Sequence, residues 1–151
     1  MKNNVSINSF TFSEEELNKR VTQAQNAFLR SYGSVDRLDG PAAIIMPQLE
    51  KLFKEGRTLS KYHAVNTDRS LTVYLEKEDI SDLLEDVAKK TKTDYLAQLE
   101  QEKGRQQALL ANQLFQSELQ KEQRKKDDHE AKLKAKAAKE AKEYFQSLEE
   151  Q

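Results

Sequence analysis

The last part of the chain contains almost nothing that can stop a helix. From residue 93 to residue 151 there is no proline and a single glycine, Gly104. Because proline and glycine are the residues that most often interrupt helices, we expect one helix to run through most of this region. About 55 helical residues would span roughly 80 Å at 1.5 Å per residue.

A chain with this composition cannot fold as one compact globule. Apolar residues make up 36% and charged residues 34% of the 151 residues, whereas average domains have about 45–50% and about 25%. We therefore predict a mainly α chain with three parts. An extended N-terminal arm covers residues 1–12, a small α-rich (α+β) domain covers residues 13–92, and a long charged interaction helix covers residues 93–151.

The sequence "FSEEEL" marks the start of the first helix. Ser13 is a helix N-cap residue, and Glu16 three positions later completes a capping box. Phe12 and Leu17 flank the cap at the spacing of a hydrophobic staple. An apolar residue then recurs every three or four positions, as on one helix face, and we place the end of this helix at Gly33.

The next segment is predicted to be a connector followed by a second helix. Residues 34–41, "SVDRLDGP", are rich in turn-forming residues, with the turn itself at residues 39–41. Proline is costly inside a helix but can begin one, so we place the second helix at residues 47–55. The preceding apolar run, residues 42–46, is expected to be buried.

A β-hairpin is predicted at about residues 61–76. Apolar and polar residues alternate over residues 71–75, which is typical of a strand. Turn-forming residues precede this strand, and residues 62–65 would supply its partner. A short helix over residues 59–65 is the alternative. An amphipathic helix follows in "EDISDLLEDVAKK", and Thr93 with Asp94 offers a new cap at which the long helix would begin.

The apolar faces of these elements predict the core of the small domain. We expect it to contain Leu17, Val21, Phe28, Ile44, Ile45, Leu49, Leu52, Phe53, Val73, Leu83 and Leu84.

The long helix carries two apolar patches separated by residues 120–130, which include no apolar side chain. Ala138, Ala141, Phe145 and Leu148 follow steps of three and four, so the helix has partial coiled-coil character. A sustained coiled coil would need unbroken heptads, which this region lacks. The predicted partner-binding residues are Leu109, Leu110, Leu114, Phe115 and Leu119 in the first patch and Tyr144, Phe145 and Leu148 in the second.

These patches favour an interaction or assembly function. Burying one large apolar side chain gains about 1.5–3 kcal/mol, so the patches need a complementary surface. The covering surface is the small domain folding back, a second copy of this chain, or another protein. We expect a second copy, which makes a homo-oligomer, or docking of the helix on a larger complex. Small proteins of phages and mobile elements often have this build.

Nucleic acid is the alternative partner. Residues 120–143 contain nine basic and six acidic side chains. Lysine and arginine can neutralise phosphates, but Glu–Lys pairs four residues apart, as at Glu122/Lys126 and Glu130/Lys134, favour pairing within the helix. The residues that would contact nucleic acid are Arg124, Lys125, Lys126, Lys132, Lys134 and Lys136.

The expected order of helices, hairpin and long helix resembles that of dimeric winged-helix regulators. The resemblance covers residues 14–92 and is architectural only. It implies that residues 14–76 would contact nucleic acid and that the long helix would form the dimer. Residues 41–55 contain only Lys51 and Lys54 as bases, which is few for a helix that reads base edges.

No motif indicates an enzyme, a cofactor or a metal site. The chain has no cysteine and only two histidines, His63 and His129, whereas zinc needs three or four convergent ligands. The acidic pairs Asp79/Asp82 and Glu85/Asp86 are typical of the solvated side of an amphipathic helix. We therefore expect a non-enzymatic protein without cofactor or metal.

The sequence predicts no membrane association. No apolar stretch approaches the 18 residues of a membrane span, and "MKNNVSINSF" lacks the apolar segment of a signal peptide. The absence of cysteine fits a reducing compartment. We therefore expect a cytoplasmic protein.

Overall fold

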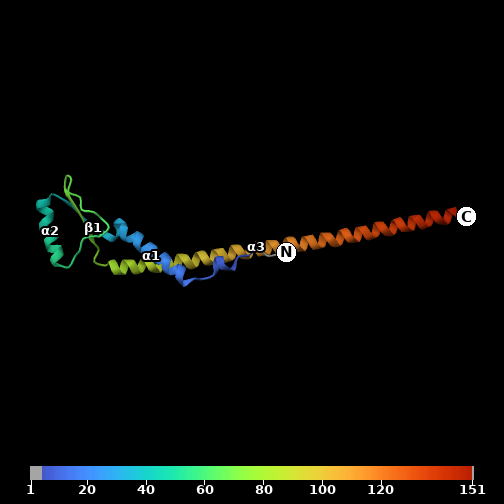
Figure 1. Cartoon of the computed structure of the whole chain (residues 1–151), viewed down its shortest axis with the longest axis horizontal. Helices are drawn as coiled ribbons and strands as arrows, with labels where there is room; N and C mark the ends of the chain where they lie inside the picture. Colours follow the sequence, from blue (N-terminus) through green and yellow to red (C-terminus); the bar gives the residue numbers. More distant parts are fainter. Residues whose placement is uncertain (1–4, 151) are drawn as a thin grey trace. The chain divides into compact units, whose positions relative to one another are not determined.

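The computed structural model describes residues 5–150, which form three α-helices and a two-stranded antiparallel sheet (Figure 1). The helices are α1 (Glu14–Arg30), α2 (Ala42–Lys54) and α3 (Ile80–Glu149), and the strands are β1 (Val35–Gly40) and β2 (Leu71–Glu76). The prediction of a mainly α chain that ends in a long helix is confirmed.

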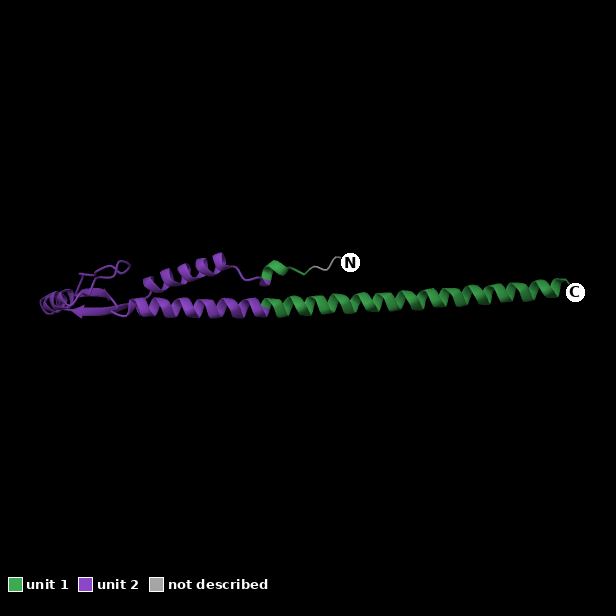
Figure 2. Ribbon diagram, turned by 90° about the horizontal axis from the view of Figure 1, so that it is seen from below, with its two compact units in different colours: residues 1–9, 102–151 green, residues 10–101 purple. Residues whose placement is uncertain are grey.

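The chain divides into two compact units, coloured separately in Figure 2. Unit 1 comprises residues 1–9 and 102–151, and unit 2 comprises residues 10–101. Helix α3 supplies residues to both units. The sequence analysis ended the small domain at residue 92, whereas unit 2 extends to residue 101.

Helix α1 begins where the capping signal predicted. The Ser13 hydroxyl accepts a hydrogen bond from the backbone N–H of Glu16 at 3.3 Å. The Glu16 carboxylate pairs with Arg20 at 2.9 Å. The predicted end at Gly33 is three residues too late. The Ser31 hydroxyl donates to the Phe28 carbonyl at 2.6 Å, and Gly33 lies in a 3₁₀ helix, η2 (Tyr32–Ser34).

The predicted extended arm differs in the part that the structure describes. Residues 1–4 lie outside the described residues, and Ile7–Phe10 forms a 3₁₀ helix, η1. The Ser9 hydroxyl donates to the Ser6 carbonyl at 2.8 Å. Short polar side chains that bond to the nearby backbone compete with extended structure, which explains the tight turn.

The predicted connector is in fact a strand. Residues 35–40 form β1, which pairs antiparallel with β2 and places Leu38 opposite Val73. Strand β1 contains two aspartates and a glycine, which are depleted in strands. This composition led to the prediction of a connector. Charged side chains are nevertheless common on short edge strands, where they oppose further pairing.

The hairpin prediction is correct for its second strand, β2, which covers residues 71–76. Residues 62–65 are not a strand. The chain reverses before β2 with isolated bridges from Leu59 to Leu75 and from Asn66 to Thr72. The regular partner of β2 is β1, which lies earlier in the chain.

Helix α2 begins at Ala42, five residues before the predicted start, and it contains Pro47. The Pro41 carbonyl accepts the first helical bonds from Ile44 and Ile45 at 2.9 and 3.0 Å. Because α2 begins before Ile45, both Ile45 and Leu49 belong to the helix. They are four residues apart and therefore lie on the same face, which covers the sheet. Burial of these side chains offsets the cost of an internal proline.

The core of unit 2 lies between α2 and one face of the sheet. Ile45, Leu49, Val73 and Leu75 form a buried cluster. The prediction was wrong for Ile44 and Phe53, which are 57% and 44% exposed because they lie on the outer side of α2. The predicted core residues that are half-buried are Leu17, Val21, Phe28, Leu52, Leu83 and Leu84.

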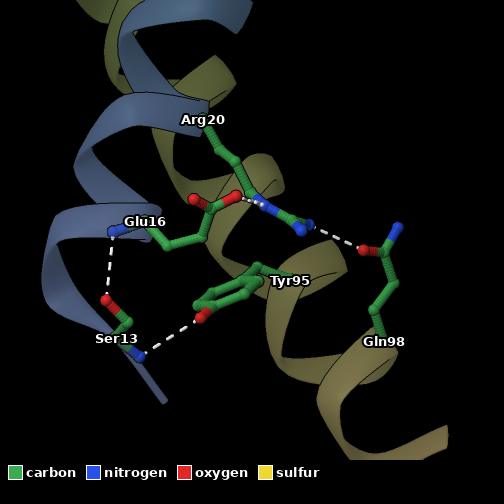
Figure 3. Close-up of polar contacts among 5 residues, drawn as sticks. All are labelled: Ser13, Glu16, Arg20, Tyr95 and Gln98. Carbon is green, nitrogen blue, oxygen red and sulfur yellow. Dashed lines mark hydrogen bonds and ion pairs between the residues drawn. The ribbon is translucent and has the colours of Figure 1, made fainter. Parts of the chain in front are cut away.

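Helix α1 packs antiparallel against the first part of α3 within unit 2 (Figure 3). Three side-chain hydrogen bonds join them: Ser13 N–H to the Tyr95 hydroxyl at 3.1 Å, Arg20 to Gln98 at 2.7 Å, and Gln25 to the Leu84 carbonyl at 3.0 Å. Tyr95 is the one buried residue of α3, and α1 has none. This helix pair is therefore half-open to solvent.

The predicted new cap at Thr93 is wrong, because α3 continues through it without a break. The hydroxyls of Thr91 and Thr93 donate to the carbonyls of Val87 and Lys89, four residues back. Threonine in this conformation satisfies its own hydroxyl inside a helix and does not need to cap one.

Candidate functional site

The predicted partner-binding residues of the first patch are mostly exposed. Leu109, Leu114, Phe115 and Leu119 are 40–60% exposed, and Leu110 is half-buried. Phe115 and Leu119 are four residues apart and share one side of α3, while Leu110 and Leu114 share another. The first patch is therefore divided between two sides of the helix.

One side of α3 in unit 1 is partly covered. The backbone N–H of Ser6 donates to the Gln106 side chain at 3.3 Å. The half-buried positions on this side are Glu102, Gln106, Leu110, Gln113 and Ser117. Four of these five are polar, so the covered side is not the apolar one.

From residue 118 to residue 150 every residue of the helix is exposed. This stretch includes the predicted second patch, in which Tyr144 and Phe145 are 63% and 65% exposed. The two rings meet edge to face at 5.9 Å. Leu133, which the sequence analysis did not include, is another large exposed apolar residue within the stretch.

The candidate nucleic-acid residues are exposed and are distributed along the helix. Lys134 pairs with Glu130, as predicted, and Lys136 lies 3.8 Å from Glu140. No ion pair joins Glu122 to Lys126 within the described part of the chain. The arrangement is that of a solvated helix that satisfies part of its charge internally.

Glu118 lies at the beginning of this charged stretch and pairs with a lysine. The Lys121 ammonium lies 2.7 Å from the Glu118 carboxylate. This hydrogen bond, and the attraction of the two charges, lower the pKa of Glu118 below its ordinary value. Both side chains are more than 60% exposed, so solvent weakens the pair.

Sequence reasoning missed a cluster of rings in unit 2. Tyr32 of η2, His63 of the loop and Tyr74 of β2 contact one another with centroids 5.3–5.5 Å apart. They are far apart in sequence and share no periodic pattern. The strand pairing of β1 with β2 brings them together, and that pairing was not predicted.

The described residues contain neither a metal site nor a membrane-spanning helix. Within residues 5–150 no group of three or more potential metal ligands occurs. His63 instead bonds through Nδ1 to the Ser60 hydroxyl at 2.7 Å. No helix in the same residues is both long and apolar enough to cross a membrane. Comparison with known protein families, curated proteins and solved structures found no match.

Proposed function

We propose that this chain is a non-enzymatic assembly protein whose C-terminal helix associates with a second copy of itself. The observation that carries the proposal is that every residue from 118 to 150 is exposed. This stretch nevertheless carries five large apolar side chains: Leu119, Leu133, Tyr144, Phe145 and Leu148.

Energetics favour a partner for these side chains. Each ion pair along the helix contributes only about 0.2–0.5 kcal/mol. Burying one large apolar side chain gains about 1.5–3 kcal/mol. A partner that covers the second patch would therefore stabilise the helix more than its own ion pairs do.

A second copy suits the distribution of these side chains. The two patches are separated by a charged stretch, and a second copy carries the same patches at the same separation. Aligned copies can cover the second patch and the side of the first patch that carries Phe115 and Leu119. Such a self-complementary surface is what a two-fold interface requires. The charged stretch carries both signs, so the two copies need not repel each other. Partial coiled-coil pairing is the expected form.

The proposal includes a second form of interaction, in which the helix docks on a larger complex, as in small proteins of phages and mobile elements. We place the protein in the cytoplasm, with the absence of cysteine as support.

The alternative, a winged-helix-like regulator that binds nucleic acid, has less support. Only one helix, α2, lies between β1 and β2, so the second helix of a helix–turn–helix pair has no counterpart in the described chain. Lys134 and Lys136, two of its expected contacts, lie within 4 Å of acidic side chains of their own helix.

The oligomeric state of the full chain tests the proposal. Sedimentation equilibrium should give a dimer or larger species whose fraction rises with concentration. Phe145→Asp with Leu148→Asp removes two apolar anchors and should weaken association at least about 100-fold. Gln146→Asp with Ser147→Asp adds the same charge at neighbouring polar positions and should change association much less.

Two results would contradict self-association. One is a wild-type chain that stays monomeric at all accessible concentrations. The other is equal weakening by both double variants, because that would assign the effect to added charge and not to the apolar side chains.

A further inference from the structure

A hollow of about 680 Å³ opens on unit 2 beside the sheet. It lies between the end of α1, η2, the loop before β2, and β2 itself. Its lining includes Arg30, Tyr32, Tyr62, His63, Asp68 and Tyr74, so one basic and one acidic side chain border it. Three of the five tyrosines of the chain are therefore gathered at this one place.

The rings are held in position by the fold. Tyr74 projects from the face of β2 opposite to Val73 and Leu75, because side chains alternate along a strand. His63 is fixed by the hydrogen bond between its Nδ1 and Ser60, and the Tyr62 backbone N–H donates to the same hydroxyl at 3.2 Å. Neighbouring ring planes are tilted by 39–45°.

Two of the tyrosine side chains are exposed to solvent. Tyr32 is 71% exposed and Tyr62 is 49% exposed. The Arg30 guanidinium lies 6.0 Å from the Tyr62 ring centroid, and Arg30 has no ion pair within residues 5–150. On the loop that carries Tyr62, Asp68 lines the hollow, whereas Lys61 and Arg69 adjoin the lining residues in sequence only. Exposed rings are thus combined with one lining guanidinium, that of Arg30.

These features exclude two other ligand classes. A cage for a quaternary ammonium needs rings that surround an open space and face a cation. Here Tyr32, His63 and Tyr74 contact one another instead of surrounding an open space. A small-molecule pocket usually encloses most of its ligand, whereas Tyr32 is largely open to solvent.

We propose that this surface binds single-stranded nucleic acid by stacking bases on Tyr32 and Tyr62. Arg30, which lines the hollow, is positioned to neutralise a backbone phosphate. Exposed aromatic faces beside basic groups are how proteins hold single strands without reading their sequence. The basic run of α3 takes no part in this site, and the site does not depend on self-association.

Fluorescence anisotropy of the full chain with labelled 20-nucleotide (dT) and (U) strands tests this proposal. Tyr32→Ala should weaken binding about ten-fold, the typical effect of losing one stacked base. Tyr32→Phe keeps the ring face and should bind within about two-fold of wild type. Phe53→Ala removes an exposed ring on the outer side of α2, outside both the site and the two patches, and serves as the control.

Charge variants identify where the phosphates bind. Arg30→Glu should weaken binding and reduce its salt dependence, which is about 0.7 logarithmic units per phosphate for a single strand. Lys125→Glu with Lys126→Glu should leave binding unchanged. The proposal is overturned if the wild type does not bind either strand, if Tyr32→Ala and Phe53→Ala behave alike, or if only the Lys125/Lys126 variant loses binding.

Discussion

The Tyr95 hydroxyl accepts a hydrogen bond from the backbone N–H of Ser13 at 3.1 Å, which ties the cap of α1 to α3 (Figure 3). Tyr95 is only 4% exposed. The Phe12 ring lies 5.8 Å from its ring and the Arg20 guanidinium lies 4.6 Å from its centroid. The Tyr95 side chain of α3 therefore makes three contacts at and near the N-terminal end of α1.

Truncating this tyrosine should open the helix pair. Tyr95→Ala is expected to lower the free energy of unfolding of unit 2 by about 3 kcal/mol, because it removes a large buried ring. Tyr95→Phe loses only the hydrogen bond and should cost about 1 kcal/mol. Urea unfolding followed by near-ultraviolet circular dichroism measures both effects.

The neighbouring Asp94→Ala is the control, since Asp94 is exposed and should change stability by less than about 0.5 kcal/mol. Faster amide hydrogen exchange in α1 of Tyr95→Ala, with unchanged exchange in α2, would locate the effect. If Tyr95→Ala is as stable as Asp94→Ala, the packing of α1 on α3 does not depend on this ring.

The elements predicted best were those with a local signal. The cap at Ser13 and the alternation of β2 each reside in a few consecutive residues, so sequence alone located them. The long helix was predicted because residues 93–151 contain no proline and only one glycine. For the two apolar patches the sequence analysis expected a covering surface, and it did not predict that the first patch is divided between two helix sides.

The features that were missed depend on contacts between distant residues. Strand β1 reads as a turn-rich connector, and only its pairing with β2 makes residues 35–40 extended. The ring cluster of Tyr32, His63 and Tyr74 depends on the same pairing. Helix α2 overrides the local penalty of Pro47 because Ile45 and Leu49 are buried against the sheet.

Arg57 links the turn after α2 to the strands. Its guanidinium lies 2.7 Å from the Asp36 carboxylate and donates to the Glu76 carbonyl at 3.0 Å, and its side chain is only 12% exposed. Arg57→Ala should lower the free energy of unfolding by about 2–3 kcal/mol, since charged hydrogen bonds are lost near the core.

Arg57→Lys keeps the charge but not the planar fork, and it should fall between wild type and Arg57→Ala. The exposed pair of Lys54 with Glu50 provides the comparison, because Lys54→Ala should cost no more than about 0.5 kcal/mol. Urea unfolding of the three variants gives the order. Equal stability of Arg57→Ala and Lys54→Ala would mean that Arg57 does not stabilise the fold.

Asp39 should make the stability of unit 2 depend on acid pH. Hydrogen bonds from the Ser70 and Thr72 hydroxyls, both at 2.8 Å, hold the pKa of Asp39 below its ordinary value of 3.8, and Arg37 acts in the same direction. Because the pKa is lower in the folded state, the stabilisation is present above pH 3.8 and is lost as the pH falls through the folded-state pKa.

Unfolding of wild type and Asp39→Asn from pH 7 down to pH 2 measures this contribution. Glu16 also has a lowered pKa, caused first by its hydrogen bond with Arg20, so the wild type loses stability from more than one group. The difference between wild type and Asp39→Asn isolates Asp39 and should shrink toward low pH. A difference that stays constant with pH would show that the Asp39 charge is not stabilising.

Pro47 lies inside α2 and has no N–H to donate to the carbonyl of Ala43. Pro47→Ala should restore this helical hydrogen bond and relieve the contact between the proline ring and that carbonyl. We expect the free energy of unfolding to rise by about 1–2 kcal/mol, less than the full cost of about 3 kcal/mol because proline also restricts the unfolded chain.

The adjacent Gln48→Ala is the matched control, since it changes helix propensity by only a few tenths of a kcal/mol. Thermal unfolding of both variants should raise the midpoint for Pro47→Ala and leave it nearly unchanged for Gln48→Ala. If Pro47→Ala is less stable than wild type, then α2 does not continue as a regular helix through residue 47, and the segment before it is held by contacts other than helical bonds.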